Sequence, residues 1–177
     1  QSDSALAYLN RIEESADLLD KPSSLRQWIT IGRAEVYGIM GLYKSAATLL
    51  EQVHIQAEDK FLRLYYYQVA RSVYGWMADY GEVGENRKML QQLTANYRDS
   101  ILLVETNATN RAIVQADKLL NEGALQAGKE LCLRTLSHAD SLQHVYLFAL
   151  LADLSEATNN HDDYLHYLSL AALSDLE

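Results

Sequence analysis

Residues 34–50 read AEVYGIMGLYKSAATLL, which combines a helical stretch, a glycine turn and a second amphipathic stretch. The same arrangement returns three times, as YGWMADYGEVGENRKML at 74–90, ADKLLNEGALQAGKELC at 116–132 and ADLSEATNNHDDYLHYL at 152–168. The four turns fall 40, 42 and 36 positions apart, at Gly41, Gly81, Gly123 and Asn159. This period is typical of stacked helical hairpins, each of which buries its apolar face only against its neighbours.

The remainder of the chain also favours helix. Apolar residues follow helical spacing almost throughout, and no stretch alternates for long enough to indicate a strand. Helix breakers are scarce, because the chain has a single proline, Pro22, and eight glycines. We predict nine helices, at about 3–19, 24–40, 43–54, 58–79, 83–97, 100–121, 124–137, 141–158 and 162–177. Asp99 or Ser100 would cap the sixth helix, and Asp140 or Ser141 would cap the eighth.

The repeated pattern resembles the tetratricopeptide repeat (TPR) family over about residues 28–171. In that family a hairpin has a small residue on its first helix, a glycine near the turn, an alanine early in its second helix and a large apolar residue four positions later. The pattern here is degenerate, because Asn86, Gly128 and Tyr164 replace the alanine and the period exceeds the family's repeat of about 34 residues. We predict an all-α, TPR-like α–α superhelix, a right-handed solenoid of antiparallel helix hairpins.

We expect one TPR-like domain over residues 1–177, with about four hairpins and a leading helix that has no hairpin partner. The chain starts at Gln1 without an initiator Met, so we interpret it as a fragment of a longer protein. A narrower resemblance lies at 167–176, where YLSLAALSDL is similar to a segment of Bacteroidetes tetratricopeptide regulators. That resemblance implies a periplasmic sensor region ahead of a membrane-spanning helix, a coiled coil and a DNA-binding part.

Charge and hydropathy narrow the classes of partner. With 24 acidic and 15 basic residues the formal charge is −9, which repels phosphate backbones and argues against nucleic-acid binding by this segment. The longest stretch without Asp, Glu, Lys or Arg is 141–152, whereas a membrane-spanning helix needs about 20 apolar residues. We therefore predict no membrane span in this segment. A single cysteine excludes an internal disulfide, so cysteine usage leaves both the periplasm and the cytoplasm open.

No residue set in the sequence supports catalysis. The chain has no Gly-x-Ser-x-Gly elbow, no glycine-rich phosphate loop and no paired-cysteine cluster. His161, Asp162, Asp163 and His166 could ligate a metal, but their spacing does not fit a helical zinc site, and acidic residues at a helix start are common. Cys132 occupies the large buried position of the repeat, which favours packing over reactivity. We predict a protein that is not an enzyme and has no cofactor or metal.

The aromatic run at Tyr65, Tyr66 and Tyr67 spans about 300° of a helix, so at least one ring faces away from its hairpin core. The run could line a groove for a peptide or a sugar. It could equally fill gaps between helices with its hydroxyls in water, and we favour this packing interpretation because tyrosine is amphipathic.

The phase of the repeat predicts a binding groove on the inner, concave side of the stack. Its residues are mostly polar side chains that recur on the first helices of the hairpins: Trp28, Glu35, Gln68, Arg71, Asn110, Asp117, Tyr146 and Asp153. In this groove Arg71 would be a cation among Glu35, Asp117 and Asp153. The alternative is a solvated face without a ligand.

The predicted function is a non-catalytic scaffold for a protein or peptide, or for another copy of the chain, in the sensory region of a membrane-associated transcriptional regulator. The alternative is a small-molecule or glycan-binding helical domain in which Trp28, Tyr65, Tyr66 and Tyr146 stack on rings. The sequence leaves the identity of the partner open.

Overall fold

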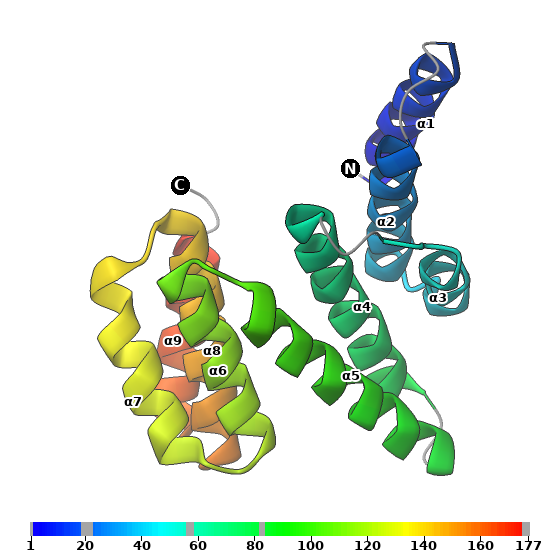
Figure 1. Ribbon diagram of the computed structural model, residues 1–177. Helices are drawn as coiled ribbons and strands as arrows, with labels where there is room; N and C mark the ends of the chain where they lie inside the picture. Colours follow the sequence, from blue (N-terminus) through cyan, green and yellow to red (C-terminus); the bar gives the residue numbers. More distant parts are fainter. Residues whose placement is uncertain (1, 19–22, 56–58, 82–83, 175–177) are drawn as a thin grey trace. The chain divides into compact units, whose positions relative to one another are not determined.

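The computed structural model describes residues 2–18, 23–55, 59–81 and 84–174 (Figure 1). These described residues form nine α-helices and one short 3-10 helix, and they contain no strand. The helices cluster into two compact units, residues 1–104 and residues 105–177. Each unit is described by itself below, and the predicted single domain over 1–177 stays a prediction.

Unit 1 contains α1 (Ser2–Leu18), α2 (Ser23–Ile39), α3 (Tyr43–Glu51), α4 (Lys60–Tyr80) and α5 (Glu85–Val104). Unit 2 contains α6 (Ala108–Asn121), α7 (Leu125–Thr135), the 3-10 helix η1 (Leu136–His138), α8 (Ser141–Ala157) and α9 (His161–Ser174). The single proline, Pro22, the repeat position Val83 and the end of the regulator-like stretch at 175–176 lie outside the described residues.

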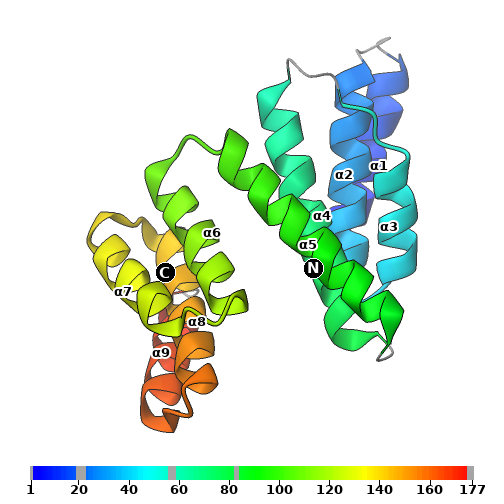
Figure 2. The same cartoon turned by 60° about the horizontal axis from the view of Figure 1, so that its bottom comes forward.

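Successive helices pair into the four predicted hairpins, α2–α3, α4–α5, α6–α7 and α8–α9. We call the first helix of each hairpin its A-helix and the second its B-helix. Within each unit, the later A-helix contacts both helices of the earlier hairpin: α4 lies against α2 and α3, and α8 against α6 and α7 (Figure 2). The leading helix α1 packs on α2 as a B-helix would. This stacking confirms the all-α, TPR-like fold.

Each unit has its own hydrophobic core, built around the small residues of the repeat. Ala34 and Ala46 in unit 1 and Ala116 in unit 2 are completely buried. The unit 1 core also includes Leu50, and the unit 2 core includes Cys132. A small side chain at these positions lets two helices approach closely, as the pattern predicts.

Three of the four predicted turn residues adopt the left-handed backbone that suits glycine and asparagine. The angle φ is 79° at Gly41, 77° at Gly123 and 55° at Asn159. Gly81 differs, because it ends α4 with φ −80° and ψ 171°, an extended conformation. A Cβ atom at Gly81 would collide with the carbonyl oxygen of Met77, so close backbone approach explains this glycine.

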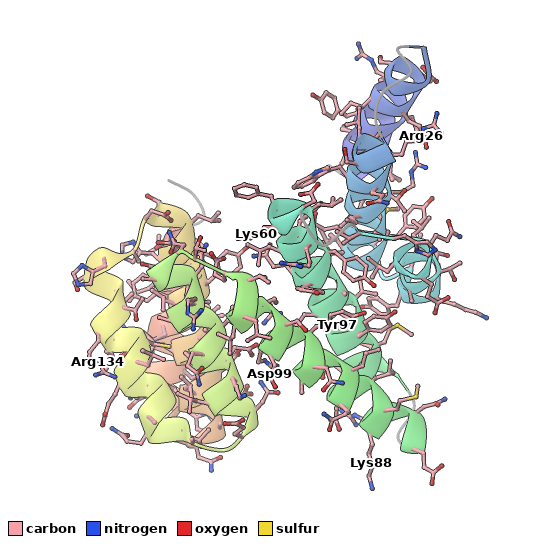
Figure 3. All side chains as sticks on the ribbon, viewed as in Figure 1. Arg26, Lys60, Lys88, Tyr97, Asp99 and Arg134 are labelled. Carbon is pink, nitrogen blue, oxygen red and sulfur yellow. The ribbon has the colours of Figure 1, made fainter. Side chains whose placement is uncertain are left out.

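The predicted start of the sixth helix is wrong. Asp99 and Ser100 lie inside α5, which continues to Val104 (Figure 3). The chain leaves the helix at Glu105, whose carboxylate accepts a hydrogen bond from the backbone N–H of Asn107 at 2.8 Å. Asn107 then caps α6, since its side chain accepts from the backbone N–H of Asn110. By contrast, the predicted cap Asp140 is confirmed, and Gln143 completes a capping box with it.

Candidate functional site

All eight residues of the predicted groove lie on A-helices, and four fall in each unit. Unit 1 holds Trp28 and Glu35 on α2 with Gln68 and Arg71 on α4. Unit 2 holds Asn110 and Asp117 on α6 with Tyr146 and Asp153 on α8. That one groove includes all eight residues stays a prediction, and so does the placement of Arg71 among Asp117 and Asp153.

In unit 1, Tyr65 joins the two A-helices on this side. The Trp28 and Tyr65 rings stack with centroids 4.9 Å apart and an interplanar angle of 20°. The Tyr65 hydroxyl donates a hydrogen bond to the Glu35 carboxylate at 2.6 Å. Trp28 nevertheless keeps 39% of its surface exposed. Tyr65 therefore fixes Trp28 and Glu35 while leaving part of the indole open to solvent.

Burial and hydrogen bonding keep the Tyr65 phenol protonated. Its partial burial raises the pKa of the Tyr65 hydroxyl far above the ordinary value of 10.0, and the hydrogen bond to Glu35 and the charge of that carboxylate raise the pKa further. The phenol therefore acts as a hydrogen-bond donor at neutral pH. Gln68 follows on the same helix and is exposed, and Arg71 is half-buried.

The rest of the tyrosine run packs against α5. The Tyr66 hydroxyl lies 3.2 Å from the Tyr97 hydroxyl, and the Tyr67 ring contacts the Tyr66 ring edge-on. Tyr74 stacks on Tyr97 with centroids 5.8 Å apart. These contacts join α4 to α5 around Tyr97, which Figure 3 labels. The geometry supports the packing interpretation for Tyr66 and Tyr67, and Tyr97 was missed because a single aromatic residue on an amphipathic helix carries no signal of its own.

In unit 2, Asn110 connects the two A-helices. Its side-chain oxygen accepts a hydrogen bond from the Gln143 amide at 2.8 Å, and its side-chain nitrogen donates to the Glu105 carboxylate at 3.3 Å. Glu105 is only 5% exposed. Neither Gln143 nor Glu105 was expected at the site. Both are buried polar side chains that need hydrogen-bond partners, which the repeat pattern alone does not identify.

The contacts of Trp28 and Asn110 are equivalent. The two residues occupy the same place in their repeats, 13 residues before the turn residues Gly41 and Gly123. Each contacts the next A-helix of its unit, Trp28 through Tyr65 and Asn110 through Gln143. Tyr146 occupies the same place in the last hairpin and is 54% exposed. This side of an A-helix therefore serves mainly as the contact surface for the next A-helix.

Acidic side chains gather on α6 and α8. Loss of hydration raises the pKa of the Asp153 carboxyl above its ordinary value of 3.8, although the residue as a whole is exposed. The negative charges of Glu156 and then Asp117 raise that pKa further. The Asp117 carboxylate accepts a hydrogen bond from the side-chain nitrogen of Asn121 at 3.2 Å. Together these groups give the unit an acidic surface.

The other reactive side chains have structural surroundings. Asp163 pairs with Lys129 at 2.7 Å, and no group of three or more His, Cys, Asp or Glu side chains among the described residues could hold a metal ion. Cys132 is completely buried, and burial raises the pKa of its thiol to about 12. A protonated, inaccessible thiol is a poor nucleophile. None of the helices that the structure describes has the length and hydropathy that a bilayer span requires.

Comparison with families of known proteins matches the SusR N-terminal TPR domain over residues 1–177. The chain belongs to this TPR family. The recognised resemblance to helical TPR proteins is thereby confirmed. TPR domains are in general non-catalytic scaffolds that mediate protein interactions, and membership indicates a protein-interaction scaffold here. Searches of curated proteins and of solved structures found no match for the chain.

Proposed function

We propose that this TPR domain is a non-catalytic scaffold for a protein or peptide, in the sensory region of a membrane-associated transcriptional regulator. The matched family takes its name from the N-terminal domain of SusR, which supports a position at the N-terminal end of a larger protein. The regulator context and the periplasmic location rest on the resemblance at 167–176.

The observation that carries the binding role is the arrangement on α2 and α4. We call the surface formed by Trp28, Glu35, Tyr65, Gln68 and Arg71 the α2–α4 face. Its indole is partly exposed and held by the Tyr65 stack at 4.9 Å, so little side-chain entropy is lost when a ligand covers it. Tryptophans that a partner covers, and that polar residues surround, are common anchors of protein interfaces.

A peptide would find complementary groups beside that anchor. An apolar side chain would cover the open part of Trp28, and Gln68 could exchange hydrogen bonds with the peptide backbone because its amide both donates and accepts. The carboxylate of Glu35 already accepts from Tyr65 at 2.6 Å and has further acceptor capacity for a donor on the ligand. The groove residues of unit 2, Asn110, Asp117, Tyr146 and Asp153, remain part of the proposal.

The alternative is a small-molecule or glycan ligand, and the same indole is the observation that favours it. A sugar ring stacks on an aromatic face through its C–H groups, and its hydroxyls need carboxylate and amide partners such as Glu35 and Gln68. A peptide and a glycan would thus both contact Trp28, so the two hypotheses differ only in the ligand.

Selection of a peptide-display library on the intact chain separates these ligands. We expect enriched peptides whose affinity for Trp28→Ala falls by about tenfold, as for an interface anchor, while affinity for Leu133→Ala is unchanged. Leu133 is the control because it is an exposed apolar residue on the B-helix α7. Circular dichroism must show equal helix content in both variants. If no peptide enriches but oligosaccharides quench the tryptophan fluorescence of wild type and not that of Trp28→Ala, which retains Trp76, the peptide role is overturned and the alternative holds.

A further inference from the structure

The last hairpin exposes a position that the first and third hairpins bury. Leu50, Cys132 and Leu168 each lie nine residues after their turn residue. Leu50 and Cys132 are completely buried, whereas Leu168 is 45% exposed. All three lie on B-helices, α3, α7 and α9. The difference therefore comes from what packs on the helix and not from the helix itself.

The burial of the first two positions depends on the following A-helix. Leu50 belongs to one core cluster with Val69 and Val73 of α4, and Cys132 to another with Leu147 and Leu151 of α8. The approach is close in unit 2, where a Cβ atom on Gly128 of α7 would lie 3.1 Å from the Leu154 side chain of α8. No described helix follows α9 to do the same for Leu168.

On the A-helix of the last hairpin, Tyr146 is more exposed than its counterpart Trp28, which is itself 39% exposed. Trp28 and Asn110 each contact the next A-helix, and their counterpart Tyr146 on α8 is 54% exposed. Leu165 on α9 is 59% exposed, while Ala47, at the same place in the first hairpin, is only 7% exposed. We call the surface of Tyr146, Asp153, Leu165 and Leu168 the α8–α9 face. These residues occupy the positions in the repeat that contact the following A-helix in earlier hairpins. The face could therefore accept one more helix.

The acidic residues of the last hairpin indicate which charge a helix bound there would carry. Residues 135–177 contain seven Asp and Glu and no Lys or Arg. Glu156 on α8 and Asp162 on α9 are exposed, and the pKa of the Asp153 carboxyl is raised first by loss of hydration and then by the negative charges of Glu156 and Asp117. A helix with Lys or Arg beside its apolar stripe would relieve this repulsion. A second copy related by a two-fold axis would instead place carboxylates against carboxylates.

We propose that the α8–α9 face binds a cationic amphipathic helix of a partner protein, which stacks on this hairpin as an additional A-helix. The inference rests on the proposed protein-scaffold function and adds the chemistry and place of one partner. The apolar stripe of the helix covers Leu165 and Leu168, a side chain packs on Tyr146, and Lys or Arg side chains lie toward Asp153. Binding of this kind uses i, i+3, i+4 and i+7 anchors in a groove between two helices.

Three synthetic helical peptides of about 18 residues, or five turns, test the proposal by fluorescence anisotropy on the intact chain. The first has a leucine–alanine stripe flanked by lysines. The second keeps the stripe and has glutamates in place of the lysines, and the third has the composition of the first in scrambled order. We expect the lysine peptide to bind at least about tenfold more tightly than either other peptide, and salt to weaken it.

The decisive variant is Leu168→Asp. Its extra carboxylate would by itself favour a cationic peptide, so an expected loss of about tenfold or more in affinity reports the apolar contact. Leu133→Asp is the matched control, because Leu133 is 44% exposed on α7, and its affinity should equal that of the wild type. Equal affinity of Leu168→Asp and wild type, or of the lysine and glutamate peptides, would overturn the proposal.

Two further results separate this proposal from the proposed function. Trp28→Ala should bind the lysine peptide normally, and a loss there with no loss in Leu168→Asp would overturn the α8–α9 face while supporting the α2–α4 face. Sedimentation velocity must show a monomer at the assay concentration. A dimer that Leu168→Asp abolishes would make a second copy the occupant and overturn the partner helix.

Discussion

Gly38 and Gly75 both lie inside A-helices of unit 1, but their surroundings differ. A Cβ atom on Gly38 of α2 would lie 2.6 Å from a ring carbon of Trp76, a distance that side chains do not tolerate. The nearest atom to a Cβ on Gly75 of α4 is a methyl carbon of Thr94 at 3.7 Å, an ordinary contact. One glycine is thus required by packing, and the other is not.

Gly38→Ala is therefore expected to destabilise the protein by about 1–3 kcal/mol through overpacking. Gly75→Ala should instead stabilise it by roughly 0.5–1 kcal/mol, because alanine loses less backbone entropy than glycine in a helix. Urea unfolding followed by circular dichroism measures both changes. A Gly38→Ala variant at least as stable as wild type would contradict the assigned contact with Trp76, and a destabilised Gly75→Ala would contradict the open surroundings of Gly75.

Asp153→Asn tests the acidic surface of unit 2. The folded-state pKa of Asp153 is raised above 3.8 by loss of hydration and then by Glu156 and Asp117. The folded state therefore holds this proton more tightly than the unfolded state, and wild-type stability falls as the pH rises from about 3.8 through the raised pKa. We expect Asp153→Asn to melt at a higher temperature than wild type at pH 7 and at the same temperature below that window.

Thermal melts of the two proteins across this pH range provide the measurement. Asp79→Asn serves as the control, since Asp79 is an exposed carboxylate in unit 1. A higher melting temperature of wild type than of Asp153→Asn at pH 7 would contradict this prediction. It would show that a hydrogen-bond donor stabilises the Asp153 carboxylate more than repulsion destabilises it.

Helix α4 contacts α2, α3 and α5, and its tyrosines make ring contacts with α2 and α5. Tyr65 meets α2, whereas Tyr66 and Tyr74 meet Tyr97 on α5. Burial and then the neighbouring Tyr97 and Glu51 raise the pKa of Tyr74 to about 12, and Tyr65 and Tyr66 shift in the same direction. Neutral phenols are thus part of the packing.

Alkaline pH should unfold unit 1 through these phenols. Between an ordinary tyrosine pKa of 10.0 and the raised pKa of about 12 for Tyr74, the unfolded chain loses protons that the folded protein keeps. Stability that is fully present below pH 10 is therefore lost as the pH rises through this window. Tyr74→Phe should lose less stability there than wild type, measured by urea unfolding at each pH.

An equivalent change at an exposed tyrosine, Tyr80→Phe, controls for the general effect of removing a hydroxyl. If Tyr74→Phe and wild type lose stability with the same slope above pH 10, the buried phenol is not the titrating group that matters.

At the scale of helices, periodicity was sufficient to predict the existence of every described α-helix, although not of the 3-10 helix η1, because each hairpin buries a regular apolar stripe. The boundary between α5 and α6 could not be predicted in the same way. Asp and Ser favour helix starts, yet Asp99 and Ser100 lie within α5, where the buried Ile101 continues the apolar stripe. The actual break depends on Glu105 and its local hydrogen bonds to Asn107 and Asn110, which the spacing of apolar residues does not record.

Across the whole molecule, the repeat phase predicted which helices carry the candidate surface but not how its side chains are used. Trp28 and Asn110 were expected to face a ligand, and each contacts the next A-helix of its unit. The phase gives the side of a helix on which a residue lies, and the same side serves helix stacking and ligand binding. Only contacts between repeats distinguish the two uses.

Each unit should fold when it is produced separately. The buried clusters of residues 1–104 and of residues 105–177 are each composed of residues from one unit, as expected when repeats interact mainly with neighbours. Circular dichroism of the two fragments should show substantial helix and cooperative thermal unfolding. A fragment 105–177 without helical signal would show that its core depends on unit 1, in agreement with a single domain over 1–177.

The burial of Cys132 makes the chain well suited to thiol-directed labelling. Its thiol is completely inaccessible and has a pKa of about 12, so a maleimide dye should not react with the native protein. A cysteine introduced at an exposed position such as Leu133 or Ile39 would then be the site of modification without removal of the natural one. A fluorophore attached in this way would report local changes in the unit that carries it.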